Sequence, residues 1–262
     1  MINGVWKNAE PVWTSGTAQM RPFRPGELRA IMSAIFGASR NEEGDMQRPW
    51  VQIAVDAVTI EEGRRLARVA VEAGADWIEA GTPIITFEGV RAIRALVDTA
   101  QGRPVVADFK AQDGVEKYFR EAGRQGASVA TVLGIVPDAS VRAAIRGGRD
   151  AGVEVTADLY AVKIGDMAGR ASELEQLGVD HVMLHLGHDE AHADPGRGCL
   201  EGLEEVLAAV SLPVGVSTFG REEAVEAVRM GASFVVQGNP ILSAPDAADQ
   251  LKQFIAAVKE AL

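Results

Sequence analysis

Three charged residues in the short stretch ADFKAQD carry the strongest chemical signal in the sequence: Asp108, Lys110 and Asp113. Residues two apart in a β-strand face the same side, so Asp108 and Lys110 should point together if this stretch is extended. Asp113 follows on the next turn, from which it could fold back or reach a neighbouring subunit. An ammonium group between carboxylates stays charged and can stabilise a developing oxyanion. The alternative interpretation is a salt-bridge cluster with a structural role.

A further acidic residue, Glu79, ends the apolar stretch before that of Asp108. Two carboxylates at one site can bind Mg²⁺, which prefers oxygen ligands and keeps several waters. Such an ion can bind the vicinal oxygens of an enediolate. The His and Cys residues lack the spacing of a zinc site. Glu79 and Asp108 together can therefore hold Mg²⁺.

His185 is the histidine best placed for proton transfer, because it ends the apolar stretch DHVMLH. An imidazole exchanges protons near neutral pH. His188 follows on the loop, and Asp189 could orient either ring. His181 begins the same stretch, so we expect it at the opposite end of the strand, away from the site.

Other polar residues also end apolar stretches, and we include them as candidate site residues: Asp56, Thr131, Asp158 and Gln237. Any one of them alone could be a turn residue or a helix cap. Several carboxylates, a lysine and a histidine on one rim favour a shared site, because separate capping roles would not require them to converge.

Apolar stretches that read as strands alternate with amphipathic, helix-like segments from residue 50 onward. The strand candidates are 51–56, 76–81, 104–110, 128–134, 153–160, 180–187, 213–218 and 234–238. Several helical segments end in a glycine, namely Gly74, Gly126, Gly152, Gly178 and Gly231, and Thr59 with Glu62 suggests a capping box. Roughly eight such units predict a closed (β/α)8 TIM barrel with its chemistry at the carboxyl ends of the strands. An open doubly wound sheet is the alternative, although no GxGxxG motif follows the first strand.

The length of 262 residues fits one such barrel, for which roughly 250 residues is typical. Residues 1–48 contain several prolines and no strand-like stretch, and the apolar spacing of 28–37 indicates one helix. We therefore predict an α/β protein with two parts. An N-terminal extension with one helix spans residues 1–48, and the barrel spans residues 49–262.

Composition excludes several classes of partner. The net charge of −11 disfavours nucleic acid. No stretch approaches the roughly 20 apolar residues that span a membrane, and the first residues do not resemble a signal peptide. The single cysteine, Cys199, fits a reducing compartment. We expect a cytoplasmic enzyme with a small-molecule substrate.

From about Val51 to its end, the sequence resembles the family of 3-hexulose-6-phosphate synthase and 3-keto-L-gulonate-6-phosphate decarboxylase, within the orotidine 5′-monophosphate decarboxylase superfamily. The resemblance rests on VQIAVD, IEAGTPIITFEGVRAIRAL, VVADFKAQDG and HLGHD. It implies a Mg²⁺-dependent enzyme that stabilises a 1,2-enediolate, and a homodimer with active sites near the interface. By position, it implies metal ligands at Glu79 and Asp108, an oxyanion-stabilising Lys110, a proton-carrying His185, and positioning roles for Asp56 and Asp113.

Two positions favour the synthase branch of this family. Asp158 stands where the decarboxylases have a glutamate, and His188 stands where they have an arginine. The resemblance thus implies an aldolase that joins a small aldehyde such as formaldehyde to a ketose such as ribulose 5-phosphate, or reverses that reaction.

Family members bind phosphate with glycine-rich turns after the seventh and eighth strands, where this chain has Ser217-Thr218 and Gly238-Asn239. Hydroxyl and amide groups can also donate to phosphate, and the sequence leaves open whether the substrate is a sugar or a sugar phosphate. The expected substrate-binding residues are Thr131, Asp158, His188, Ser217, Thr218, Gln237, Gly238 and Asn239.

Three other functions remain as alternatives. A decarboxylase of the keto-gulonate type would use the same site. A catalytically silent, ligand-binding barrel would predict a broken set at Asp108, Lys110 and Asp113, and this set is intact. A ribulose-phosphate epimerase would need metal-binding histidines on early strands, whereas the first histidine of this chain is His181.

Overall fold

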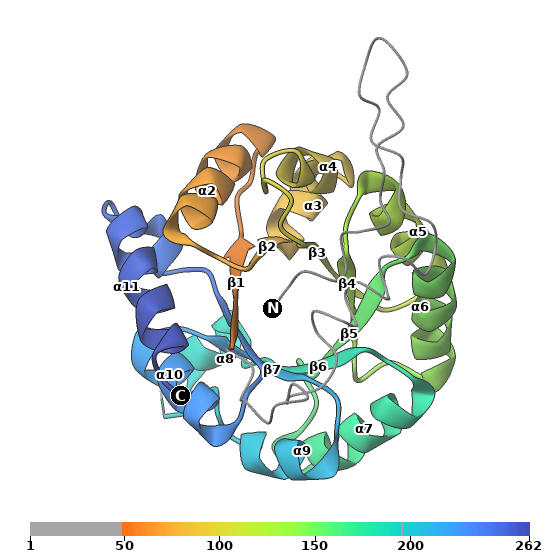
Figure 1. Ribbon diagram of the computed structural model, residues 1–262. Helices are drawn as coiled ribbons and strands as arrows, with labels where there is room; N and C mark the ends of the chain where they lie inside the picture. The colour runs from red at the N-terminus through yellow and green to blue at the C-terminus, as the bar shows by residue number, and fades with distance from the viewer. Residues whose placement is uncertain (1–48, 195) are drawn as a thin grey trace, which may run out of the picture.

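The computed structural model describes residues 49–194 and 196–262. Within them, eight parallel strands close into a barrel in chain order, and β1 pairs with both β2 and β8 (Figure 1). The predicted TIM barrel is therefore confirmed, and the open sheet is excluded. The helix predicted at 28–37 lies outside the described residues.

Each predicted apolar stretch contains one strand. The strands are β1 (Trp50–Val55), β2 (Trp77–Ala80), β3 (Val105–Ala111), β4 (Val129–Leu133), β5 (Glu154–Asp158), β6 (His181–Leu184), β7 (Val214–Thr218) and β8 (Phe234–Gln237). Almost all of their residues are buried, as expected for a parallel sheet covered by helices.

Helices surround the strands on the outside of the barrel (Figure 1). They are α2 (Ile60–Ala73), α3 (Thr82–Glu88), α4 (Arg91–Val97), α5 (Val115–Gln125), α6 (Asp138–Ala151), α7 (Ile164–Leu177), α8 (His188–Ala193), α9 (Leu203–Ala209), α10 (Arg221–Met230) and α11 (Ala247–Lys259), with a 3-10 turn η1 (Ile241–Ser243). The five predicted glycines follow helix ends in left-handed conformations. Thr59 accepts a hydrogen bond from the amide of Glu62, so half of the predicted capping box forms.

Aromatic side chains fill the lower interior of the barrel, near the amino ends of the strands. The rings of Trp50 and Trp77 stack with centroids 5.6 Å apart, and Phe234 lies 5.6 Å from Trp77. Gly215 makes room for this packing, because a Cβ atom there would overlap the ring of Phe234. His181 lies against Trp77 and Phe234, at the end of its strand that the sequence predicted. The interior is thus a packed core below the site.

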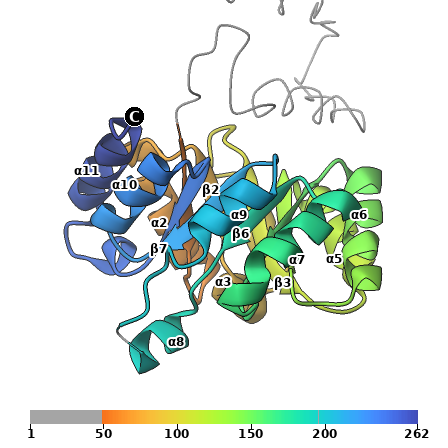
Figure 2. The ribbon, with the colours of Figure 1, turned by 90° about the horizontal axis from the view of Figure 1, so that it is seen from below.

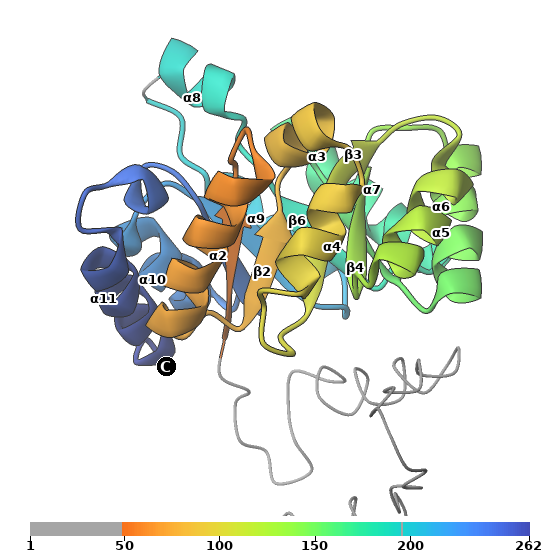
Figure 3. The ribbon, with the colours of Figure 1, turned by 90° about the horizontal axis from the view of Figure 1, so that it is seen from above.

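The ends of the described chain meet at this lower side. Lys259 in α11 donates to the carboxylate of Asp76 (2.5 Å) and to the carbonyl of Pro49 (2.6 Å). Asp76 also accepts from the amide of Val51 (2.7 Å). At the opposite side, α8 projects beyond the carboxyl ends of the strands (Figures 2 and 3). Among the described residues, no helix has the length and apolar character needed to cross a bilayer.

Candidate active site

The carboxyl ends of the strands surround a cavity of about 640 Å³, within the size range of small-molecule sites. The predicted site residues that line it are Asp56, Glu79, Asp108, Lys110, His185, His188, Ser217, Thr218, Gly238 and Asn239. Thr131, Asp158 and Gln237 are buried next to this lining. The structure therefore gathers all but one of the predicted residues around one cavity.

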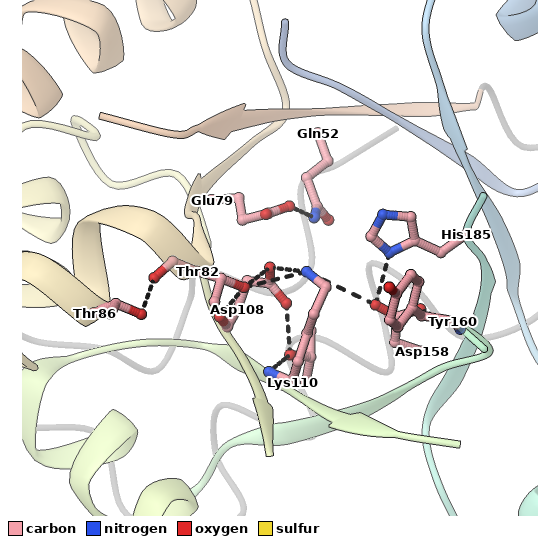
Figure 4. A network of polar contacts seen from close by, with 10 residues as sticks. Gln52, Glu79, Thr82, Thr86, Asp108, Lys110, Asp158, Tyr160 and His185 are labelled. Carbon is pink, nitrogen blue, oxygen red and sulfur yellow. Dashed lines mark hydrogen bonds and ion pairs between the residues drawn. The ribbon is translucent and has the colours of Figure 1, made fainter. Parts of the chain in front are cut away.

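Lys110 is placed by an irregularity near the end of β3. The register with β4 shifts between Ala107 and Ala111, and Lys110 has a φ of 43°, which is uncommon for a residue with a side chain. Its amide donates to Oγ1 of Thr131 (2.9 Å), and its ammonium donates to the carboxylate of Asp108 (Figure 4). Asp108 and Lys110 meet as predicted, but through a bulge instead of regular strand alternation.

Two threonine hydroxyls hold the carboxylate of Asp108. Thr131 Oγ1 donates to its Oδ1 (2.8 Å), and Thr82 Oγ1 donates to its Oδ2 (2.7 Å). The ammonium of Lys110 also donates to Thr82 Oγ1 (3.2 Å). Burial raises the pKa of Asp108, but the charge of Lys110 and these donors outweigh it and hold the pKa below its ordinary value. Asp108 is therefore a fixed anion.

Lys110 keeps its charge although it is largely enclosed. Burial lowers its pKa, but the negative charges of Asp108, Asp158 and Glu79 raise the pKa above that of a free lysine. Its Nζ lies 4.0 Å from Oδ2 of Asp158, on the side opposite Asp108 (Figure 4). A cation held between two carboxylates and open to the cavity is suited to stabilise negative charge on a substrate oxygen.

Glu79 and Asp56 add further negative charge to the same cavity. Glu79 is buried and accepts a hydrogen bond from the side chain of Gln52. Its burial, and then the charge of Asp108, raise its pKa well above the ordinary value. Asp56 lies at the mouth of the cavity. Partial loss of hydration next to the surrounding protein, and then the charge of Asp108, raise the pKa of Asp56. With Asp108 and Asp158, four acids thus crowd around Lys110.

This crowding fits a divalent cation. The carboxylates of Glu79 and Asp108 are hard oxygen ligands, and Mg²⁺ needs only one or two of them when waters or substrate complete its shell. No larger cluster of three or more possible metal-binding side chains occurs among the described residues. A cation at this pair would favour the charged form of Glu79, whose pKa is raised by burial and then by the charge of Asp108. The donor set is consistent with the predicted Mg²⁺ site.

His185 directly follows β6 and is oriented by Asp158, the last residue of β5. Its Nδ1 lies 2.9 Å from Oδ2 of Asp158 (Figure 4). Burial lowers the pKa of His185, but the charge and hydrogen bond of Asp158 raise it above that of a free histidine. Because Nδ1 is engaged, Nε2 is the atom suited to exchange protons with a substrate. Asp158 thus contacts both His185 and Lys110, and its predicted role as a substrate ligand stays a prediction.

The loops after β7 and β8 form the other wall of the cavity. Thr218 donates to the carbonyl of Val236 (3.2 Å), and Gln237 donates to the carbonyls of Gly238 and Asn239 (3.3 Å each). These bonds tie Thr218 to the backbone of β8 and Gln237 to the loop that follows β8. The half-buried Ser217 is the remaining hydroxyl from this wall.

Asp113 is the predicted site residue that the chain does not bring to the cavity. It is exposed, just before α5, and lines a separate surface cavity of about 510 Å³ between the first turns of α5 and α6. Of the two positions that the sequence allowed, folding back within the chain is wrong. The second, a contact with a neighbouring subunit, stays a prediction.

Sequence reasoning missed several residues of the site, among them Gln52, Thr82, Tyr160 and Phe219. Gln52 could have been found, because it is the polar residue inside an otherwise apolar strand. Thr82 also had a signal, because it follows the second strand by one glycine. Nothing in the sequence separates Tyr160 and Phe219 from aromatic residues of the core.

Comparisons with known proteins point to one family. The profile of the orotidine 5′-phosphate decarboxylase / HUMPS family matches residues 49–254. A relative from Staphylococcus saprophyticus, 3-hexulose-6-phosphate synthase 3, is 34% identical over 198 residues, which are 75% of this chain and 92% of the relative.

Solved structures resemble the fold as well. A crystal structure of 3-hexulose-6-phosphate synthase is 32% identical with a TM-score of 0.72, covering 79% of this chain and 99% of that one. KGPDC from Streptococcus mutans, solved in complex with a sugar phosphate, has a TM-score of 0.71 and covers 81% of this chain and 98% of that one. Its 21% identity makes it a likeness of fold alone.

Proposed function

The chain belongs to the orotidine 5′-phosphate decarboxylase / HUMPS family, and from this membership and its site we propose an aldolase that joins formaldehyde to ribulose 5-phosphate, or reverses that reaction. As a member of this family it is an enzyme of the carbon–carbon lyase class. The observation that carries the proposal is the ammonium of Lys110, fixed by Asp108 and facing the same cavity as Glu79 and His185.

The proposed reaction begins with removal of a proton from C1 of the ketose by Nε2 of His185. The electron pair of that C–H bond forms a C1–C2 double bond, and the carbonyl electrons move to the C2 oxygen. Lys110 stabilises this oxyanion. The C1–C2 double bond then supplies the electrons with which C1 attacks the carbon of formaldehyde, and the C2 oxyanion re-forms the carbonyl. The formaldehyde oxygen takes the proton back from His185. One carbon–carbon bond forms, and no oxidant or reductant is needed.

Glu79 and Asp108 would hold Mg²⁺ in this proposal, and the ion would supply further stabilisation for negative charge on neighbouring oxygens. In the same proposal, Asp56 at the cavity mouth would contact a hydroxyl of the ketose. Ser217 of β7 and Asn239, which follows β8, would contact its far end.

The direct test is incubation of the purified protein with Mg²⁺, ribulose 5-phosphate and formaldehyde. We expect loss of formaldehyde and formation of a six-carbon ketose phosphate. Lys110→Ala should abolish most of this activity, while Lys252→Ala, which removes an exposed lysine of α11, should not. Release of CO₂ from a β-keto acid sugar phosphate without aldol activity would instead support the decarboxylase. Absence of both reactions would support the silent barrel.

We also propose that the protein is a homodimer in which Asp113 of one subunit completes the site of the other. The exposed position of Asp113 at the surface cavity between α5 and α6 supports this arrangement. The test mixes two inactive variants, Asp113→Ala and Lys110→Ala, after joint unfolding and refolding. In a symmetric dimer with shared sites, mixed dimers contain one intact site, which restores about a quarter of the wild-type activity. Absence of restored activity, or a monomer in light scattering, would refute this part.

A further inference from the structure

Tyr160 stands directly beside the proton-carrying histidine. Its ring lies 5.5 Å from the ring of His185, centroid to centroid, with the planes tilted by 54°. Both side chains line the cavity (Figure 4). Tyr160 follows the last strand residue of β5 by two positions, and His185 follows the last strand residue of β6 by one. Neighbouring strand ends thus bring the two rings together.

The ring of Tyr160 also occupies the space beside Gly187. A Cβ atom at Gly187 would clash with Cε2 of Tyr160 and lie 3.3 and 3.4 Å from its Cδ2 and Cζ. The φ and ψ of Gly187 are −65° and 148°, which any residue can adopt. The backbone conformation of residue 187 therefore does not require glycine. Glycine is needed there because a larger side chain would overlap the ring of Tyr160.

Asp158 connects the tyrosine and the histidine from below. Its Oδ1 accepts from the amide of Tyr160 (2.9 Å), and its Oδ2 lies 2.9 Å from Nδ1 of His185. The side chain of Asp158 is fully buried, so one immobile carboxylate fixes both residues. Asp158 thereby holds Nδ1 of the imidazole, and the ring of Tyr160 packs beside the imidazole. Gly187 in turn leaves the space that the ring of Tyr160 occupies.

We propose that Tyr160 is a positioning residue, seated against Gly187, that keeps the imidazole of His185 in the orientation that directs Nε2 at the substrate. This inference rests on the proposed function, in which His185 carries the proton. The ring of Tyr160 performs this role, and its hydroxyl is not required. Misplacing a catalytic group by about 1 Å can cost about 10²-fold in rate.

Kinetics of two tyrosine variants form the first test. Tyr160→Ala should lower kcat about 10- to 100-fold and change KM by less than about 3-fold, because the orientation of His185 is lost and the substrate contacts remain. Tyr160→Phe retains the ring and should keep kcat within about 2-fold of wild type. An equal loss in both variants would assign the effect to the hydroxyl and overturn the proposal.

A double-mutant cycle with Gly187 tests the seating directly. Gly187→Ala should displace Tyr160 and lower kcat, whereas Gly169→Ala, on α7 with free space around it, should not. Because Gly187→Ala acts through Tyr160, the pair Gly187→Ala/Tyr160→Ala should be no slower than Tyr160→Ala alone. Multiplication of the two separate effects would show that Gly187 acts independently and would refute the inference.

Long-range ¹H–¹⁵N spectra of the His185 imidazole provide a readout that needs no activity. Above the pKa of His185, the wild-type ring should show one tautomer, with the proton on Nδ1. Tyr160→Ala and Gly187→Ala should show tautomer averaging, and Tyr160→Phe should not. If the wild type shows the single tautomer but no aldolase activity, the proposed function fails while the positioning role stands. If all variants match the wild-type spectrum, the positioning role fails, whatever the activity.

Discussion

Replacing Lys110 by alanine should reduce both activity and stability, and the two losses can be separated. The substitution removes the cation that lies against Asp108 and 4.0 Å from Asp158. Loss of one preorganised donor to an oxyanion costs about 10²- to 10³-fold in kcat, which is about 3–4 kcal/mol of transition-state stabilisation. Loss of one partner of a buried ion pair also destabilises the fold by about 3–5 kcal/mol. The lysine side chain is 23% exposed, so we expect the lower end of that range.

A charge-balanced variant distinguishes the two effects. In Lys110→Met/Asp108→Asn, the buried carboxylate loses its charge together with the lysine. The hydroxyls of Thr82 and Thr131 can still hydrogen-bond the amide that replaces Asp108. Urea unfolding should therefore show a smaller loss of stability than in Lys110→Ala. Activity should stay as low as in Lys110→Ala, because neither the oxyanion donor nor the carboxylate is restored.

The assay measures kcat/KM for formaldehyde consumption at saturating Mg²⁺, alongside the free energy of unfolding from urea titration. Lys252→Ala serves as the control for removal of a lysine from the surface. If Lys110→Ala retained kcat/KM within about 5-fold of wild type, well short of the loss expected for an oxyanion donor, Lys110 would have a structural role and the mechanism would be wrong. If the charge-balanced variant regained activity, the loss in Lys110→Ala would reflect misfolding of the site.

Three further outcomes follow from the other buried groups. Burial lowers the pKa of His181 to about 4, although the charge of Asp180 opposes this shift. His181 therefore takes up a proton from about pH 6.5 downward in the unfolded chain, but only near pH 4 in the folded protein. Stability should therefore fall by on the order of 3 kcal/mol between these values, and urea unfolding of His181→Gln should show a flatter dependence on pH. Burial opposes the charge and hydrogen bond of Asp158, which raise the pKa of His185, so Asp158→Asn should lower that pKa in an NMR titration. Binding of Mg²⁺ should release protons, because burial and then the charge of Asp108 raise the pKa of Glu79. Calorimetry in two buffers of different ionisation enthalpy measures this proton release, and the release should be absent in Glu79→Gln.

The barrel could be predicted from the sequence because its signals are local and repeated. Each strand is an apolar stretch, and the glycines after the helices occupy positions that favour a left-handed residue. The fold then places all the strand ends on one rim without any knowledge of contacts. Glu79 and His185 could be assigned to one cavity in this way, although their strands are far apart in the sequence.

The roles within the site could be predicted less well, because they depend on which atoms meet. Asp158 had the residue type of a substrate ligand, but its two oxygens are used by His185 and by the backbone of Tyr160. The direction of Lys110 depends on a bulge that strand alternation does not describe. Asp113 follows the end of β3, so strand alternation does not say where its side chain lies, and the structure has it away from the cavity.

The apolar core of the barrel also forms the floor of the cavity. Met183 and Val236 belong to the interior cluster that contains Trp77 and Phe234, and they also line the cavity. Side chains two apart on a strand face the same way, so Trp77 in the core is followed by Glu79 in the site on β2. Packing of the aromatic layer therefore determines the height and direction of the acid above it. A smaller residue at Trp77 should consequently impair catalysis as well as stability, even though it touches no substrate, because closely packed interiors transmit strain to their neighbours.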